Sequence, residues 1–154
     1  MGNTILERVS SIKYLGVMLD ENFNWAVHIS HLQKKLAGSV SILSKLKYYV
    51  DTKLLIHIYP ALIASRLHYG ITCWGAATQT ALKPIKVLQN RAIRFILKVS
   101  RYTKLDVSYL NLRLLKFDDI YHLKIAQFMF NYQQGTLPPF LKTFLLGSMT
   151  FTTI

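Results

Sequence analysis

Two adjacent carboxylates, Asp118 and Asp119, are the first candidates for chemistry in this chain. Paired carboxylates can hold magnesium ions, but two-metal chemistry also needs a further carboxylate from another element. Here the pair precedes a helical pattern of apolar residues that begins at Ile120. Carboxylates in the first turn of a helix interact favourably with the positive end of its dipole. We therefore predict that this pair caps a helix and is not catalytic.

The histidines and the single cysteine give little support to metal or nucleophilic chemistry. His28 and His31 lie three residues apart in a predicted helix, and no further ligand with zinc-site spacing is near them in the sequence. We interpret them as capping or surface histidines. Cys73 has an apolar context without a positioned base, so neither an internal disulfide nor a catalytic thiol is predicted.

The basic residues are a stronger signal. The chain has 19 Lys plus Arg against seven Asp plus Glu, a net charge of +12 that favours a polyanionic partner. No acidic residue occurs between Asp51 and Asp106, so the cations of a predicted helix over residues 80–99 lack acidic partners along the helix. Opposite its apolar side lies a stripe of Lys83, Lys86, Asn90, Arg94, Lys98 and Arg101, with Arg91 beside it. Such a ridge either contacts phosphates or is an ordinary solvated surface.

Helices are the elements that must position most of these residues. Apolar residues that recur every three or four positions predict helices over 24–50, 80–99, 105–112 and 118–134. A further, strongly apolar helix is predicted to start at Asp51 or Thr52 and to kink or break at Pro60. Alternation over residues 13–19 predicts a β-strand before the first helix. The fold class is therefore mainly α, with about five helices and a short N-terminal strand.

Single residues mark details of these elements. We predict that the Asn24 side chain caps the first helix and that Gly135 ends the last one. In the helix over 80–99, Pro84 is expected in the first turn and Val99 at the end of the buried stripe. Tyr69 is assigned to packing.

The chain has the length of one compact domain. We expect a strand-and-turn junction over 1–23, a helical domain over 24–146 and a frayed or truncated tail over 147–154. The most apolar window, Leu54–Trp74, contains Pro60 and Arg66, so it is not expected to span a membrane. No apolar signal-peptide core is present at the start of the sequence. A soluble intracellular location, in nucleus or cytoplasm, is the expectation.

Three blocks of the sequence resemble one known family. They are IKYLGVMLDENFNWAVHI over Ile12–Ile29, the run Ile58–Ile63 leading to Tyr69-Gly70 and Trp74-Gly75, and LQNRAIR over Leu88–Arg94. In this order and spacing they resemble the stretch after the palm domain in reverse transcriptases of non-LTR retrotransposons, the jockey-like long interspersed elements. The resemblance extends from about residue 12 to about residue 144.

This resemblance implies a thumb and connection region of an RNA-directed DNA polymerase, downstream of the catalytic aspartates. Such a region holds the template–primer duplex, and its first strand helps to position the primer end. Carried over to this chain, Tyr14, Leu15 and Gly16 would approach the primer backbone. Together with the charge pattern, the resemblance favours further nucleic-acid contacts by Lys13, Lys34, Lys35, Lys86, Arg91, Arg94, Lys98 and Arg101. Magnesium would be held only by the missing palm domain, so no cofactor is expected here and the chain alone is predicted to be inactive.

The implied partners are an RNA–DNA hybrid or duplex DNA and the missing palm and fingers domains, with no small-molecule substrate and no membrane. An alternative is a repurposed or relic helical protein-interaction module without nucleic-acid function. A peripheral membrane binder is a third possibility, but the basic and apolar faces suit a buried core better than a lone interfacial helix.

Overall fold

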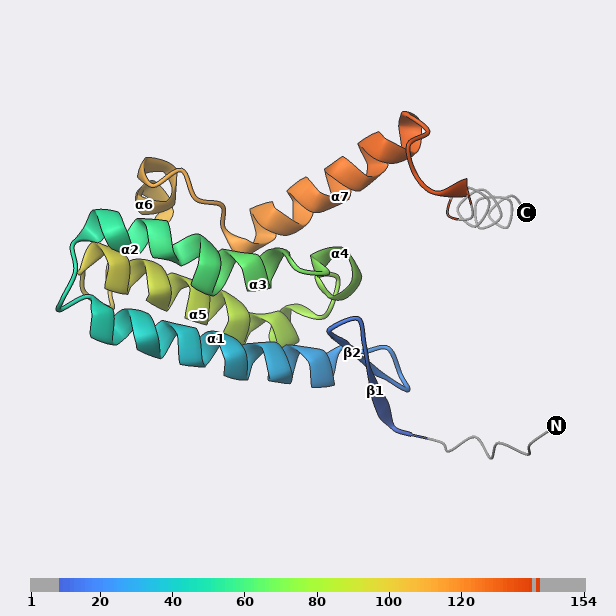
Figure 1. Ribbon diagram of the computed structural model, residues 1–154, viewed down its shortest axis with the longest axis horizontal. Helices are drawn as coiled ribbons and strands as arrows, with labels where there is room; N and C mark the ends of the chain where they lie inside the picture. Colours follow the sequence, from blue (N-terminus) through green and yellow to red (C-terminus); the bar gives the residue numbers. More distant parts are fainter. Residues whose placement is uncertain (1–8, 140, 142–154) are drawn as a thin grey trace.

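The computed structural model describes residues 9–139 and 141, in which a short β-hairpin precedes a bundle of helices (Figure 1). The hairpin consists of β1 Ser11–Tyr14 and β2 Val17–Asp20. The three long helices are α1 Ala26–Leu46, α5 Gln79–Leu97 and α7 Phe117–Gln133. The shorter helical elements are α2 Thr52–Tyr59, the π-helical turn η1 Pro60–Ala64, α3 Ser65–His68, α4 Ile71–Trp74 and α6 Asp106–Asn111. The predicted mainly α fold is confirmed.

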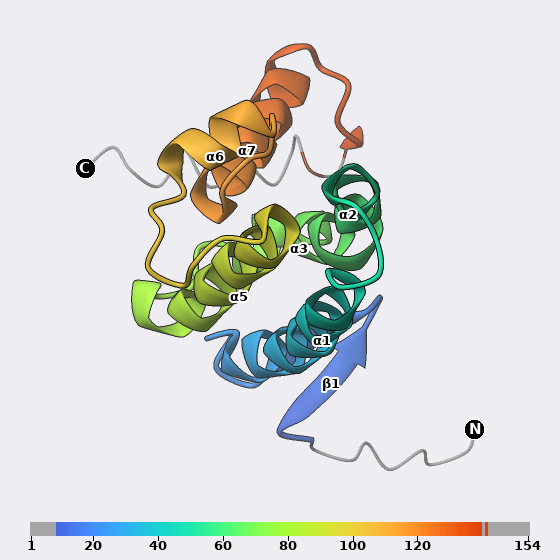
Figure 2. The ribbon, with the colours of Figure 1, turned by 90° about the vertical axis from the view of Figure 1, so that its left-hand side faces the viewer.

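The core forms where α1 and α5 lie side by side and the run from α2 to α3 packs against them (Figure 2). Each long helix buries one apolar face, as the spacing predicts. From α1 the core takes Ile29, Leu32, Leu36, Val40 and Leu43. From α5 it takes Leu82, Ile85, Leu88, Ala92, Ile93 and Ile96. Val99, which the pattern assigned to the buried stripe, lies beyond the end of α5 and is exposed.

The second helical segment begins and breaks where the sequence predicts. The Asp51 side chain accepts a hydrogen bond from the backbone N–H of Leu54 at 2.8 Å and so caps α2. Pro60 starts the π-helical turn between α2 and α3. Proline cannot donate a backbone hydrogen bond, so a change of helical winding at this point is its expected consequence.

The prediction of one strand over residues 13–19 is wrong, because the chain reverses in the middle of that range. Tyr14 pairs with Val17 across an antiparallel hairpin, and Leu15 and Gly16 form the connection. Their φ angles are 44° and 82°, and positive φ at both central residues is what a two-residue type I′ turn requires. The turn is also exposed, with 74% of the Leu15 surface accessible, so this segment is not a buried strand.

The last helix starts against the bundle and extends away from it (Figure 1). The backbone N–H of Phe117 donates to the buried Gln89 side chain of α5 at 2.9 Å, so Gln89 satisfies the first turn of α7. Gly135, with φ of 69°, follows the helix as predicted. The expected tail over 147–154 lies outside the described residues. Within the described part of the chain, no helix is long and apolar enough to cross a membrane.

Candidate nucleic-acid interface

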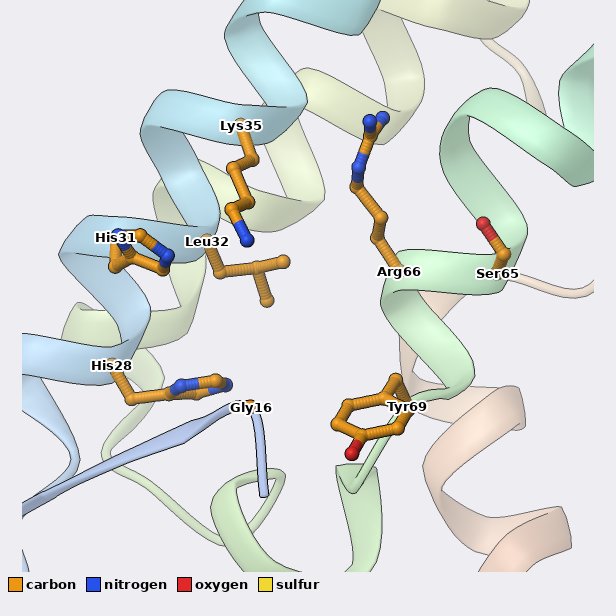
Figure 3. A pocket seen from close by; sticks show the side chains of 8 residues that line it. All are labelled: Gly16, His28, His31, Leu32, Lys35, Ser65, Arg66 and Tyr69. Atoms are coloured by element: carbon orange, nitrogen blue, oxygen red, sulfur yellow. The ribbon is translucent and has the colours of Figure 1, made fainter. Parts of the chain in front are cut away.

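A cleft of about 280 Å³ lies between α1 and α3, and the turn of the β-hairpin closes one end of it (Figure 3). Its lining surface is mostly apolar, with basic and hydroxyl groups among the side chains that form it. The lining residues are Gly16, His28, His31, Leu32, Lys35, Ser65, Arg66 and Tyr69. Three elements that are distant in the sequence therefore contribute to one site.

The Asp20 carboxylate fixes the hairpin to the start of α1. Asp20 is only 8% exposed, and its oxygens accept hydrogen bonds of 3.1–3.2 Å from the backbone N–H groups of Asn22, Asn24 and Trp25. The Asn24 side-chain oxygen accepts from the N–H of Ala26 at 2.9 Å, but the N-cap position of α1 is Trp25 and not Asn24. These bonds satisfy backbone donors that neither the hairpin nor the helix can pair.

Two side chains hold the hairpin turn against the helices. The backbone N–H of Met18 donates to Nδ1 of His28 at 3.2 Å, and the Tyr69 hydroxyl donates to the carbonyl oxygen of Leu15. Gly16 also lies close to Tyr69, since a Cβ atom at Gly16 would lie 3.3 Å from the Tyr69 ring. The exposed turn is thus a fixed part of the cleft.

The cleft is electropositive. Lys35 and Arg66 project into it from opposite sides (Figure 3), and none of its lining residues is acidic. In the described part of the chain, neither cation forms an ion pair with a carboxylate. Burial lowers the pKa of His28, and the neighbouring His31 and Lys35 lower it further. The neutral form of His28 therefore predominates at pH 7. The bond from Met18 requires this form, because only an unprotonated Nδ1 can accept it.

Arg66 and His31 differ in how far their polar groups are satisfied. The Arg66 guanidinium donates to the Ser39 hydroxyl and to the carbonyl oxygen of Leu62, which orients it from the protein side. The Nε2 atom of His31 is buried and has no hydrogen-bond partner among the described residues. An unpaired buried nitrogen of this kind is costly unless a ligand or water completes it.

The structure brings together some of the predicted nucleic-acid contacts of the hairpin and α1. Gly16 and Lys35 line the cleft, and Leu15 lies at its mouth. Lys13 and Tyr14 are exposed on β1 next to the turn. Lys34 is exposed in a shallower hollow beside the same helix, together with Met18 and His31.

The predicted residues of α5 form a separate group. Arg91, Arg94 and Arg101 line a hollow of about 340 Å³, and exposed Lys98 donates to the carbonyl oxygen of Val50 at 3.2 Å. These contacts place the group at the C-terminal ends of α1 and α5, opposite the hairpin (Figure 1).

Lys86 of α5 has an acidic partner outside its own helix, where the prediction found none along the helix. Its amino group lies 2.7 Å from a carboxylate oxygen of Asp118 and also donates to Gln79. The sequence could not show this ion pair, because α7 meets α5 only in the folded chain. Pro84 also lies inside α5, beyond the first turn.

The carboxylate pair lies in the first turn of α7, as predicted, with Asp118 and Asp119 both exposed. Neither caps the helix, whose N-cap residue Lys116 makes no side-chain cap bond. Across the described residues, no group of three or more His, Cys, Asp or Glu side chains is placed to hold a metal ion.

Sequence reasoning missed His28, Arg66 and Tyr69 as residues of the cleft. Arg66 and Tyr69 lie in the most apolar segment of the chain, where the aromatic residue was assigned to packing. The available signal was the Tyr69-Gly70 pair, which belongs to one of the blocks that carry the family resemblance.

Comparison with known proteins identifies relatives of one kind. The chain is 28% identical over 117 residues to a protein described as a probable RNA-directed DNA polymerase from transposon X-element of Drosophila melanogaster. It is 32% identical over 101 residues to the RNA-directed DNA polymerase from mobile element jockey of Drosophila funebris. The resemblance to retrotransposon reverse transcriptases is confirmed. A third relative, a probable RNA-directed DNA polymerase from transposon BS of Drosophila melanogaster, is 31% identical over 103 residues.

These polymerase relatives are much longer than the chain. The alignments cover 72%, 62% and 65% of this chain but only 13%, 11% and 11% of the three polymerases. No family model and no solved structure matches the chain. The likeness therefore concerns one segment of a large polymerase.

Proposed function

We propose that this chain is a thumb-and-connection segment of a retrotransposon RNA-directed DNA polymerase and that it holds the template–primer duplex. The observation that carries the proposal is the electropositive cleft, which is closed at one end by the hairpin turn of the block Ile12–Ile29 that resembles the polymerases. The palm and fingers of that polymerase would supply the magnesium ions and the nucleotide-binding groups.

The cleft would contact the sugar–phosphate backbone. Lys35 and Arg66 would pair with phosphate oxygens, and the exposed turn of Tyr14, Leu15 and Gly16 would lie along the primer strand, with Lys13 beside it. Because Tyr69 anchors the turn, its position relative to the two cations is fixed in advance. Contacts to phosphate set the register and orientation of the duplex but carry no sequence information.

Salt-dependent binding of a fluorescently labelled RNA–DNA hybrid tests the cleft. The double substitution Lys35→Gln and Arg66→Gln should weaken binding and lower the slope of log affinity against log salt by about 0.9 for each lost phosphate contact. Lys83→Gln is the matched control, since Lys83 is exposed on α5 and lines neither basic hollow. Equal slopes for wild type and the double variant would exclude the cleft from the binding site.

The inactivity of the isolated chain is a separate part of the proposal. In a primer-extension assay with magnesium and deoxynucleotides, we expect no product from the purified chain, with an intact reverse transcriptase as the positive control. Extension by the chain alone would contradict the assignment to a non-catalytic segment.

Competition between labelled hybrid and unlabelled duplex DNA then determines which of the two the cleft prefers.

The exposed apolar surface of α7 favours a second candidate function, that of a helical protein-interaction module. Leu123, Met129 and Phe130 are 42–59% exposed on the part of α7 that extends from the bundle. This surface would pack against another part of the polymerase or another protein. A chain that binds no hybrid at low salt, but associates with a partner in a manner abolished by Phe130→Ser, would support this alternative.

A further inference from the structure

Three exposed tyrosines lie at the end of the bundle opposite the hairpin. Tyr48 and Tyr49 follow α1, and Tyr102 lies between α5 and α6. Their side chains are 77%, 84% and 81% exposed, which is unusual because tyrosine side chains are usually at least partly buried. We call this surface the aromatic end and define it by these tyrosines and the cations Lys45, Lys47, Lys98 and Arg101.

Contacts between α1 and α5 make the aromatic end continuous. Phe95 of α5 lines two adjoining hollows, one with Lys45, Lys47, Tyr48 and Tyr49 and the other with Arg91, Arg94 and Arg101. The bond from Lys98 to the carbonyl oxygen of Val50 joins the two loops at this end. The surface thus runs from the end of α1, across Phe95, to the loop that carries Tyr102.

Cations lie directly over the aromatic rings. The Lys47 amino group is 4.8 Å from the Tyr48 ring centre and 4.9 Å from that of Phe95. The Arg101 guanidinium is 5.0 Å from the ring centre of Tyr102. These distances are typical of cation–π contacts, which leave the outer face of each ring and part of each cation open to a ligand.

The acidic residues that follow these tyrosines in the sequence, Asp51 and Asp106, are already used within the protein. Asp51 accepts the capping bond from Leu54, and Asp106 is paired with Lys116 at 2.6 Å. The aromatic end therefore keeps an excess of positive charge. Cations at helix C-terminal ends also stabilise the helix dipoles, but that effect gives no reason for the exposed tyrosines.

We propose that the aromatic end binds an unpaired strand of nucleic acid. Bases would stack on Tyr48, Tyr49 and Tyr102, and the phosphates between them would contact Lys45, Lys47 and Arg101. Exposed rings alternating with cations are the combination that binds single strands without strong sequence preference. Lys35 of the cleft and Lys45 of the aromatic end are ten residues apart on α1, a rise of about 15 Å, so the two sites are separate.

The test compares two triple variants in their affinity for labelled 12-nucleotide oligo(dT) and oligo(U). Replacing Tyr48, Tyr49 and Tyr102 with alanine should weaken binding by about tenfold or more, because each stacked base is lost with its ring. Replacing the same three with phenylalanine keeps the rings and should leave the affinity within about twofold of wild type. All three side chains are exposed, and unchanged circular dichroism would verify that the fold is retained.

Photocrosslinking locates the strand independently. An oligonucleotide carrying 5-bromodeoxyuridine should crosslink to peptides that contain Tyr48, Tyr49 or Tyr102. The Lys35→Gln, Arg66→Gln variant of the cleft should keep this crosslink while its hybrid binding weakens, so failure of the cleft and failure of the aromatic end are distinguishable.

Two results would overturn the proposal. The first is an alanine variant that binds the oligonucleotides as tightly as wild type. The second is a phenylalanine variant that is as weak as the alanine variant, because stacking does not need the hydroxyl groups. Loss of self-association or protein binding in the alanine variant, with oligonucleotide affinity unchanged, would assign the surface to a protein partner instead.

Discussion

Replacement of Gln89 by methionine should destabilise this protein more than most single substitutions, because Gln89 joins three elements from within the core. Its side chain is 2% exposed. Its amide nitrogen donates to the Tyr59 hydroxyl at 3.0 Å and to the carbonyl oxygen of Leu115 at 2.9 Å. Its amide oxygen accepts from the backbone N–H of Phe117, also at 2.9 Å.

The expected magnitude follows from the partners that Gln89→Met leaves unpaired. Methionine has nearly the same length and creates little cavity, so the cost comes mainly from lost hydrogen bonds. A buried polar group without a partner costs about 1–3 kcal/mol, and three affected groups that partly relax give about 3–5 kcal/mol. A domain of this size has a free energy of unfolding of about 5–15 kcal/mol, so the loss is a large fraction of the total.

Urea denaturation followed by circular dichroism measures this loss directly. The matched control is Gln33→Met, which makes the same chemical change at an exposed position of α1 and should alter stability by less than about 0.5 kcal/mol. A loss below about 1 kcal/mol for Gln89→Met would refute the reasoning, because the three bonds would then contribute nothing beyond those of a surface amide.

Three further predictions concern close packing, pH and the hairpin. Gly75→Ala should destabilise the fold by about 2 kcal/mol or more, because the new Cβ would lie 2.5 Å from a Tyr121 ring carbon. Gly38→Ala is the control: its new Cβ meets nothing within 4 Å, and the change should stabilise the fold by about 0.5–1 kcal/mol. The thermal melting temperatures of the two variants should therefore shift in opposite directions. Because the folded state lowers the pKa of His28, neutral His28 contributes its full stabilisation of the fold above the ordinary pKa of 6.5. That contribution is lost as the pH falls through the lowered pKa. The urea midpoints at pH 7 and pH 5 should therefore differ less in His28→Gln than in wild type. Asp20→Ala removes the acceptor of three backbone N–H groups and should cost about 2 kcal/mol in the same denaturation assay, with increased hydrogen exchange confined to the hairpin and the start of α1 if the bonds act locally.

The long helices could be predicted from the sequence because burial selects one face of a regular helix. The apolar spacing located α1, α5 and α7 to within a few residues at most ends, and Pro60 and Gly135 marked a break and an end. The hairpin escaped prediction since Leu15 sits at positive φ, where leucine is rare and no sequence pattern points to it. Alternating apolar residues continued through the turn and so looked like a single strand.

The site was less predictable than the fold, because tertiary contacts decide which charges remain free. Lys86 and Arg91 belong to the same basic stripe in the sequence, yet Asp118 pairs with Lys86, whereas Arg91 lies exposed beside a hollow. Arg66 stands among apolar neighbours in the sequence, and only the folded chain places it across the cleft from Lys35. The spacing of residues along one helix cannot predict contacts of this kind between helices.

The π-helical turn sets the rotational phase of the segment that follows it. The buried residues of this run recur at four-residue steps, at Leu55, Tyr59, Ile63 and Leu67. In an α-helix each such step overshoots a full turn by about 40°, so the apolar line would wind out of the core. The wider winding of the π-turn absorbs this drift. Removing one residue from it would rotate the rest of the helix by about 100° and carry Arg66 and Tyr69 away from α1. The cleft thus depends on helical phase as much as on the chemistry of its side chains.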